Sequence, residues 1–399
     1  MKNQQGFSLV ELMVSCTIVL LIVGATLGTF NTALNATQAI TLMADTQENL
    51  RAGMNYMVRD LIQTGEGIPQ GGITVPNTAG ISAVNRPGPG TPAASFGVFT
   101  NTWTALPAIT PGPAQGPITT TSGVGTDMVT VMYADTTLQD TSGHWLNEFP
   151  IKYPPTGTAS TPGCAAANST PEPQGAITTS GTTTTITFDS SCIVINNGNT
   201  GLNAGDLILL QNNNTMGDGD GSVTGTDAAI SASSGAMALM CISSVNTAAP
   251  NSVTFSSNDP FNLNASGATL GTLANMKTGG NYPVTTATRI WMITYFIDNT
   301  NPQRPQLMRQ VNLNQPQAVG EVIENLQIYY DILNAGSSPI TVTNDVEAPN
   351  TNQLADIRDA YILMYARSEV GFSHSNQYFR NNLETAVSIR GLDFYNQFQ

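Results

Sequence analysis

The first thirty residues read MKNQQGFSLVELMVSCTIVLLIVGATLGTF (residues 1–30), and they decide the fold. A short polar leader with one positive charge, Lys2, gives way to apolar residues at Phe7. The strongly apolar part, residues 9–30, is about as long as a bilayer-spanning helix. Basic residues return only at Arg51, and an early Lys favours a leader that stays cytoplasmic. The sequence therefore predicts a single membrane-spanning helix with a cytoplasmic N-terminus.

Glu11 is the unusual residue of this run. A carboxylate in an apolar span costs a few kcal/mol, and such residues are functional candidates by default. A cleavable secretory signal would place a small-residue site after the apolar run, whereas Gly6 lies before it. An ordinary membrane anchor remains as an alternative, but it does not account for Glu11.

The segment GFSLVELMVS (residues 6–15) resembles the processing motif of type IV prepilins and type II secretion pseudopilins. The resemblance implies that a prepilin peptidase cleaves between Gly6 and Phe7 and methylates the new N-terminus at Phe7. It also implies that Glu11 pairs with the N-terminal amine of a neighbouring subunit. Such a pair between packed helices offsets the desolvation penalty of both charges.

The helix is expected to continue beyond the membrane. Apolar residues recur at helical spacing, and Gly65, Gly67 and Pro69 then stop the pattern. A helix from Phe7 to about Gln63 would be roughly 85 Å long. Its second half would lay an apolar stripe on the globular domain, made of Leu50, Met54, Met57, Val58 and Leu61.

The rest of the chain predicts β-structure. Runs rich in β-branched and aromatic residues alternate with turn residues, at 127–133, 183–188, 206–211, 237–245, 289–297, 306–311, 326–332, 360–366 and 385–391. Residues 318–326 are expected to form a short helical turn. Two Pro/Gly/Thr-rich tracts, 66–125 and 153–176, are expected to be insertions at the periphery.

Four segments follow from these patterns: a leader at 1–6, a membrane or filament-core helix at 7–30, its extracytoplasmic continuation at 31–65, and a β-rich globular domain at 66–399. The fold class is α+β, with the long helix packed on an antiparallel β-sheet in a type IV pilin-like arrangement. The order of elements also resembles the PilW family of minor pilins and the related J-type minor pseudopilins. NYMVRDLIQTGEG (55–67) and a hairpin of NAGDLILL with MALMCISSV carry that resemblance.

Composition, charge and motifs argue against two classes of function, nucleic-acid binding and catalysis. The 399 residues carry a net charge of −14, so broad nucleic-acid binding is unfavourable and none is expected. The two histidines, His144 and His374, stand far apart, and no common catalytic motif occurs, so we expect no enzyme. The aromatic residues Trp291, Tyr295, Phe296, Tyr329 and Tyr330 are interpreted as core and strand-face packing rather than a sugar or base platform.

Two further kinds of site are considered from the sequence, a metal site and a disulfide. GDGDGSVTGTD brings together Asp218, Asp220, Ser222 and Asp227, but position twelve is Ala229, so the EF-hand spacing fails. We expect an acidic turn and no cofactor, with Ca²⁺ as the alternative. Of the four cysteines, Cys16 lies in the apolar run, and one extracytoplasmic disulfide can form. Cys164–Cys192 is the preferred pair and Cys192–Cys241 the alternative.

The leading hypothesis is a minor pilin that primes a type IV pilus and stays at or near its tip. Its partners would be other minor pilins, the major pilin and prepilin peptidase. It would reside in the inner membrane before assembly and on the pilus and cell surface afterwards. The alternatives are a minor pseudopilin of a type II secretion system, and an adhesin that the pilus carries.

Overall fold

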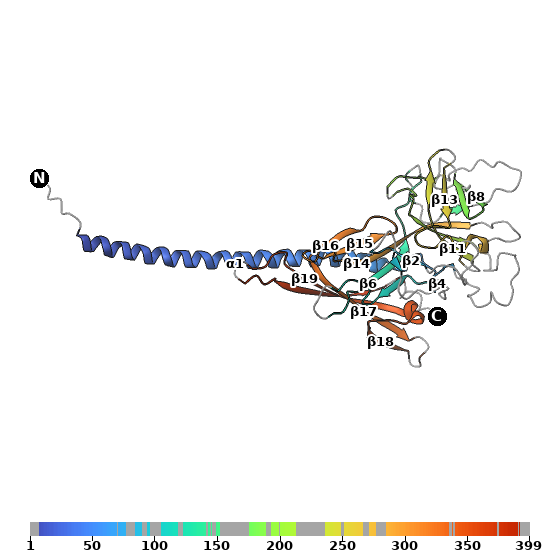
Figure 1. The fold of residues 1–399 in the computed structure, drawn as a ribbon. Helices are drawn as coiled ribbons and strands as arrows, with labels where there is room; N and C mark the ends of the chain where they lie inside the picture. Colours follow the sequence, from blue (N-terminus) through green and yellow to red (C-terminus); the bar gives the residue numbers. More distant parts are fainter. Residues whose placement is uncertain are drawn as a thin grey trace.

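The computed structural model describes residues 8–389 and 391, apart from 70, 77–83, 90–93, 96–104, 119–122, 141–142, 144, 146–148, 152–174, 189–192, 199, 213–235, 249–250, 266–270, 277–284, 335–336, 338–339 and 373–374. One helix, α1 (Leu9–Gln63), extends from one end of the molecule, and β-sheets gather around and beyond its C-terminal half (Figure 1). The expected helix ending at Gln63 is confirmed. After it, Gly65 and Gly67 adopt left-handed conformations with φ of 86° and 69°, which glycine tolerates best.

The largest sheet, here the central sheet, follows the order β11-β10-β14-β15-β16, and β5, β6 and β7 also join it. Its strands are β5 (Ile109–Gly112), β6 (Met128–Ala134), β7 (Phe149–Ile151), β10 (Leu207–Asn212), β11 (Ala236–Cys241), β14 (Thr285–Asp298), β15 (Gln306–Val311) and β16 (Gln317–Glu321). All of its named pairs are antiparallel. The expected hairpin of the 206–211 and 237–245 runs is present, because Leu207 faces Cys241 across β10 and β11.

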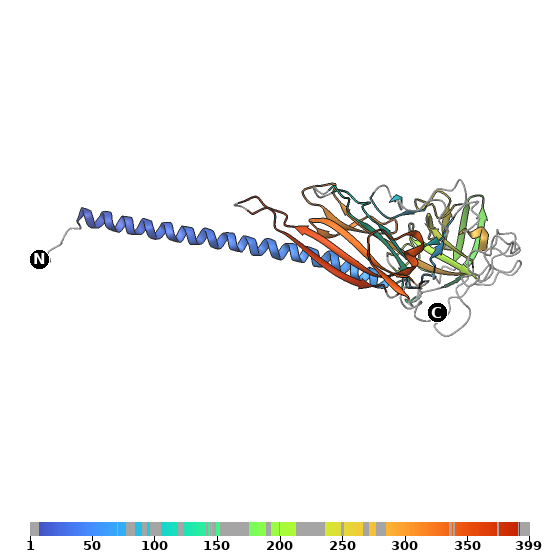
Figure 2. The same ribbon diagram turned by 90° about the horizontal axis from the view of Figure 1, so that it is seen from below.

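Two four-stranded sheets flank the central sheet. The helix-side sheet has the order β18-β17-β19-β20, formed by β17 (Ile323–Asn334), β18 (Thr341–Val346), β19 (Ile357–Arg367) and β20 (Arg380–Ser388). The distal sheet has the order β12-β13-β9-β8, formed by β8 (Gly175–Ser180), β9 (Thr183–Phe188), β12 (Ser244–Asn246) and β13 (Ser252–Ser256). Figure 2 shows the helix-side sheet alongside α1 and the distal sheet at the far end.

Short elements complete the description. Two small ribbons pair β1 (Ile73–Thr74) with β4 (Ala105–Leu106) and β2 (Asn85–Arg86) with β3 (Ala94–Ser95). Two 3₁₀ turns are η2 (Leu273–Met276) and η3 (Thr351–Asp356). An α+β architecture with one long helix and antiparallel sheets is thereby confirmed.

Buried apolar side chains form two cores, and β14 contributes to both. The distal core includes Phe255, Leu209 and the β14 residue Ile290. The helix-side core includes Met57, Ile328 and the β14 residue Tyr295. Because one continuous strand runs through both, the two cores are mechanically joined.

Three expectations were wrong. Residues 318–326 are not a helical turn but β16 and the start of β17, and Val322 between them takes a positive φ of 54° as the chain passes from one sheet to the next. The run 237–245 is two strands in different sheets, β11 and β12. The 66–125 tract is not wholly peripheral, since Ile73, Leu106 and Ile109 are fully buried. The pattern of residues within a run does not indicate which sheet its strands join. A Pro-rich tract can still bury the apolar residues that it contains.

Candidate functional site

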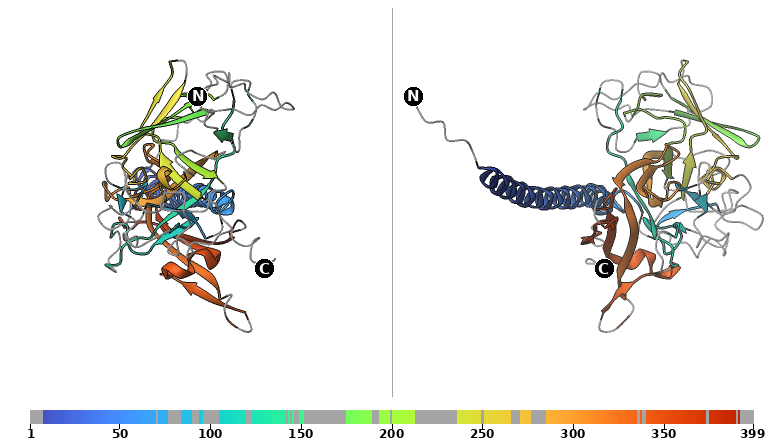
Figure 3. Two further views of the ribbon diagram at one scale, coloured as in Figure 1. Left: turned by 90° about the vertical axis from the view of Figure 1, so that its right-hand side faces the viewer. Right: turned by 60° about the vertical axis from the view of Figure 1, so that its left-hand side comes forward.

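The N-terminal half of α1 contacts no other part of the described structure. Every residue from 9 to 37 is exposed, and the apolar stretch is long enough to cross a membrane. Large side chains are bare along it, for example Leu9 at 75%, Leu21 at 74% and Phe30 at 62% exposure. Exposed apolar area of this size marks an interaction surface for lipid or protein. Figure 3 shows this half of the helix projecting away from the sheets.

Glu11 lies in the first turn of this bare helix. The Ser8 backbone N–H donates a hydrogen bond to Glu11 Oε2 at 3.2 Å, in the arrangement of a capping box. A carboxylate at this position also interacts favourably with the positive end of the helix dipole. The carboxylate is thus held at the helix start and exposed, and Glu11 is the fifth residue after the predicted cleavage point.

The C-terminal half of α1 is anchored by the predicted apolar stripe. Leu50, Met54, Met57 and Leu61 are buried against the sheets, and Val58 packs partly buried beside them. The stripe prediction is confirmed. Packing of this face holds the helix rigidly on the globular part and leaves its other half free.

A buried polar cluster adds to this anchor. Asp60, fully buried on α1, accepts hydrogen bonds from Tyr133 Oη at 3.1 Å, Tyr295 Oη at 2.6 Å and Arg309 Nε at 2.6 Å. The donors come from β6, β14 and β15. A buried charge is tolerated only when paired and hydrogen-bonded, and these three donors meet that need. Sequence reasoning missed this cluster, because the four residues are up to 249 positions apart.

A second buried ion pair lies on the distal side of β14. Arg289 Nε donates to Asp135 Oδ2 at 2.7 Å, and Trp291 Nε1 donates to Asp135 Oδ1 at 2.7 Å. Arg289 also reaches Asp206 at 3.5 Å. Burial raises the pKa of Asp206, while Arg289 opposes that rise. The cluster ties β14 to the loops before β10 and after β6.

Several predicted site residues lie outside the described residues: Gly6, Phe7, Cys164, Cys192, Asp218, Asp220, Ser222, Asp227, His144 and His374. The processing, disulfide and calcium predictions therefore stay predictions. Cys241 is a buried free thiol, which does not support its pairing with Cys192. Cys16 is exposed on the bare helix. Among the described residues, no three His, Cys, Asp or Glu side chains are placed to hold a metal ion.

Comparison with known protein families finds a match at the N-terminus of the chain. The family model described as the prokaryotic N-terminal methylation motif matches residues 1–27. No curated protein and no solved structure matches the chain. The motif is the signal of type IV prepilin-like proteins and implies processing by prepilin peptidase in a pilus context. The bare apolar helix fits membrane anchoring before assembly.

Proposed function

We propose that this chain is a minor pilin that primes assembly of a type IV pilus and sits at or near its tip. The observation that carries the proposal is the methylation motif at residues 1–27, which covers much of a long apolar helix half that contacts nothing else in the described chain. A helix of this kind requires a bilayer before assembly and neighbouring helices after it.

In this mechanism the bare half of α1 stores the subunit in the inner membrane with the leader on the cytoplasmic side. Cleavage after Gly6 frees the Phe7 amine. That amine pairs with Glu11 of an adjoining subunit and sets the axial register, while apolar helix faces bury against one another. The ammonium would replace or join the Ser8 N–H that Glu11 accepts at 3.2 Å in the single chain.

The shape of the globular part supports a position at the tip. The lobe that carries the distal sheet lies beyond the C-terminal end of α1, along the direction of the helix (Figures 1 and 2). In a filament whose helices run along its axis, that volume belongs to the subunit stacked above. A subunit with bulk there fits best where no subunit follows, at the tip.

Processing is tested by intact-mass and N-terminal analysis of the chain from its native host, with and without prepilin peptidase. We expect a mature chain that begins at N-methylated Phe7, and a precursor that accumulates in the peptidase-deficient strain. A chain that still begins at Met1 would contradict the proposal and leave an ordinary membrane anchor.

Position is tested by immunogold labelling of the native filaments. We expect label at filament ends and few filaments when the gene is deleted. Label spread along the shaft would contradict the tip position. Loss of protein secretion with intact pili would instead assign the chain to the pseudopilus of a type II secretion system.

A further inference from the structure

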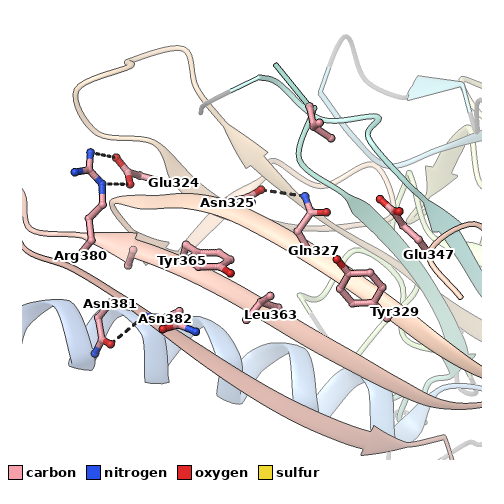
Figure 4. Close-up of a pocket in the computed structure, with 12 residues that line it drawn as sticks. Glu324, Asn325, Gln327, Tyr329, Glu347, Leu363, Tyr365, Arg380, Asn381 and Asn382 are labelled. Atoms are coloured by element: carbon pink, nitrogen blue, oxygen red, sulfur yellow. Dashed lines mark hydrogen bonds and ion pairs between the residues drawn. The ribbon is translucent and has the colours of Figure 1, made fainter. Parts of the chain in front are cut away.

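A groove crosses the face of the helix-side sheet that points away from α1. Its volume is about 760 Å³, and Figure 4 shows its lining side chains on that face. Six of the lining residues alternate along three strands: Asn325, Gln327 and Tyr329 on β17, Leu363 and Tyr365 on β19, and Asn382 on β20. We call these six residues the tyrosine groove. Val124, 51% exposed, also lines it.

The register of the strands places these side chains in rows. Asn325 lies opposite Tyr365, and Tyr365 lies opposite Asn382, so one row reads amide, ring, amide across three strands. Gln327 lies opposite Leu363 in the next row. Side chains on alternate positions, such as Ile328, point to the opposite face and are buried in the core. Packing in the core therefore does not account for the amide groups and aromatic rings that line the groove.

The amides in the groove retain hydrogen-bonding capacity. Gln327 Nε2 donates to Asn325 Oδ1 at 3.1 Å. Among the described residues, the carbonyl oxygen of Gln327 and the amide nitrogen of Asn325 have no hydrogen-bond partner. A side-chain amide both donates and accepts, as does a hydroxyl group, so the two are matched in chemistry. Tyr365, 39% exposed, adds an open ring beside them.

Charge in the groove disfavours anionic ligands. The charged residues that line the groove include the carboxylate Glu324 and one cation, Arg380, whose Nε lies 2.9 Å from Glu324 Oε2. Glu347 also lines the groove and is exposed. An uncharged ligand meets no repulsion here.

We propose that the tyrosine groove binds an uncharged saccharide. The apolar face of a sugar ring would pack on Tyr365 or Tyr329, and its hydroxyl groups would exchange hydrogen bonds with Asn325, Gln327 and Asn382. The groove presents the face of a sheet, so recognition must come from side chains. An extended peptide is recognised instead by backbone hydrogen bonds at a sheet edge. This reverses our interpretation of Tyr329 as packing only, and it does not depend on the role of the chain in a filament.

The test uses the full chain purified in detergent and three neutral probes: tri-N-acetylchitotriose, cellotriose and maltotriose. We expect saturable calorimetric binding of at least one probe, with a Kd of about 1 mM. Tyr365→Ala and Asn382→Ala should each weaken that binding about tenfold or more. Two variants are used so that misfolding of one cannot be mistaken for loss of the site. Asn382 is exposed on β20, so its replacement leaves the core untouched. Tyr56→Ala on α1, where Tyr56 is 43% exposed, is the matched control and should bind as the unmodified chain does.

Three outcomes would overturn the proposal. One is no binding of any probe at 10 times the expected Kd, or about 10 mM. The second is binding that Tyr365→Ala and Asn382→Ala leave unchanged, which would place the sugar elsewhere. The third is binding of decaproline in place of the saccharides, since aromatic-lined grooves also accept polyproline helices.

Discussion

The Glu11 carboxylate has two partners in this proposal, and each partner requires a different property of the side chain. Within the chain it accepts the Ser8 N–H at 3.2 Å and caps the helix. In the proposed filament it pairs with a neighbouring ammonium. A capping box accepts Gln as well as Glu, whereas an ion pair requires the charge.

Glu11→Gln separates these roles. We expect the variant to reach the membrane and to be cleaved normally, because helix capping is retained. Its recovery in sheared filaments should fall about tenfold or more, since the ammonium of the neighbour would be buried without its counter-charge. Glu48→Gln, an exposed position on the same helix, is the control. Normal incorporation of Glu11→Gln would show that capping alone explains the residue.

Asp60 is a second residue whose role depends on its partners. Asp60→Ala would leave Arg309 and two tyrosine hydroxyls without their acceptor in a buried site. We expect the free energy of unfolding to fall by about 3–5 kcal/mol, the usual cost of breaking a buried pair. Arg59→Ala removes only an exposed ion pair with Asp60, whose Oδ1 lies 3.6 Å from the Nε of the 60% exposed Arg59 side chain, and should change it by about 1 kcal/mol or less. Urea unfolding of the full chain in a mild detergent measures both.

Buried tyrosines predict a loss of stability at alkaline pH. Burial and the Asp60 charge raise the pKa values of Tyr133 and Tyr295, and burial raises the pKa of Tyr330. Unfolded tyrosines ionise near pH 10, so above that pH the folded state binds more protons than the unfolded one and stability falls. Each tyrosine held protonated costs about 1.4 kcal/mol per pH unit. Urea midpoints between pH 8.5 and pH 11 should fall less steeply above pH 10 in Tyr295→Phe, and an unchanged slope would contradict the assignment.

At the scale of elements, one half of α1 packs on the sheets and the other half is exposed. Gly53 lies where the helix packs tightly on the sheets, since an added Cβ would lie 2.9 Å from Leu307 Cδ2 and 3.4 Å from Met364 Sδ. Gly28, in the bare half, has nothing within 4 Å. A glycine inside a helix costs about 1 kcal/mol relative to alanine, so Gly53 has a packing reason.

Gly53→Val should therefore push the helix off the sheets. We expect a loss of about 1–3 kcal/mol in the unfolding free energy of the globular part, as for other overpacked sites. The same substitution at Gly28 should leave that quantity unchanged, because the bare half contacts none of the described globular part. Urea unfolding followed by near-UV circular dichroism compares the two. Equal effects at both glycines would show that the contact at Gly53 is not tight.

At the scale of the whole molecule, β14 joins the two cores. Ile290 belongs to the distal core and Tyr295 to the helix-side core, on one uninterrupted strand. Two modules with separate cores could unfold separately. Because β14 contributes to both cores here, unfolding of one core also removes part of the other.

We accordingly expect one cooperative transition. Leu209→Ala in the distal core and Ile328→Ala in the helix-side core remove buried side chains, and each should cost about 2–5 kcal/mol. Both should lower the midpoint of the same transition, monitored by circular dichroism and by tryptophan fluorescence. Two transitions, each moved by only one of the variants, would show that the lobes unfold independently.

Much of the architecture could be predicted from local patterns. The helix to Gln63, the stripe from Leu50 to Leu61 and the strands at 183–188 and 306–311 follow from periodicity and turn residues. The groove and the Asp60 cluster could not, because each assembles residues from several strands. Residues 318–326 misled the prediction because a Val–Ile–Glu run suits either state, and strand pairing decided between them.

The sequence by itself determined that the chain carries a processing motif, an apolar helix and a β-rich remainder, because these depend on residues that are neighbours along the chain. Only the tertiary structure decided which tyrosines are buried and which line an open groove. Those properties depend on strand pairings such as Tyr365 with Asn325 and Asn382. Residues brought together by pairing, far apart in the chain, leave no local pattern that a single sequence can show.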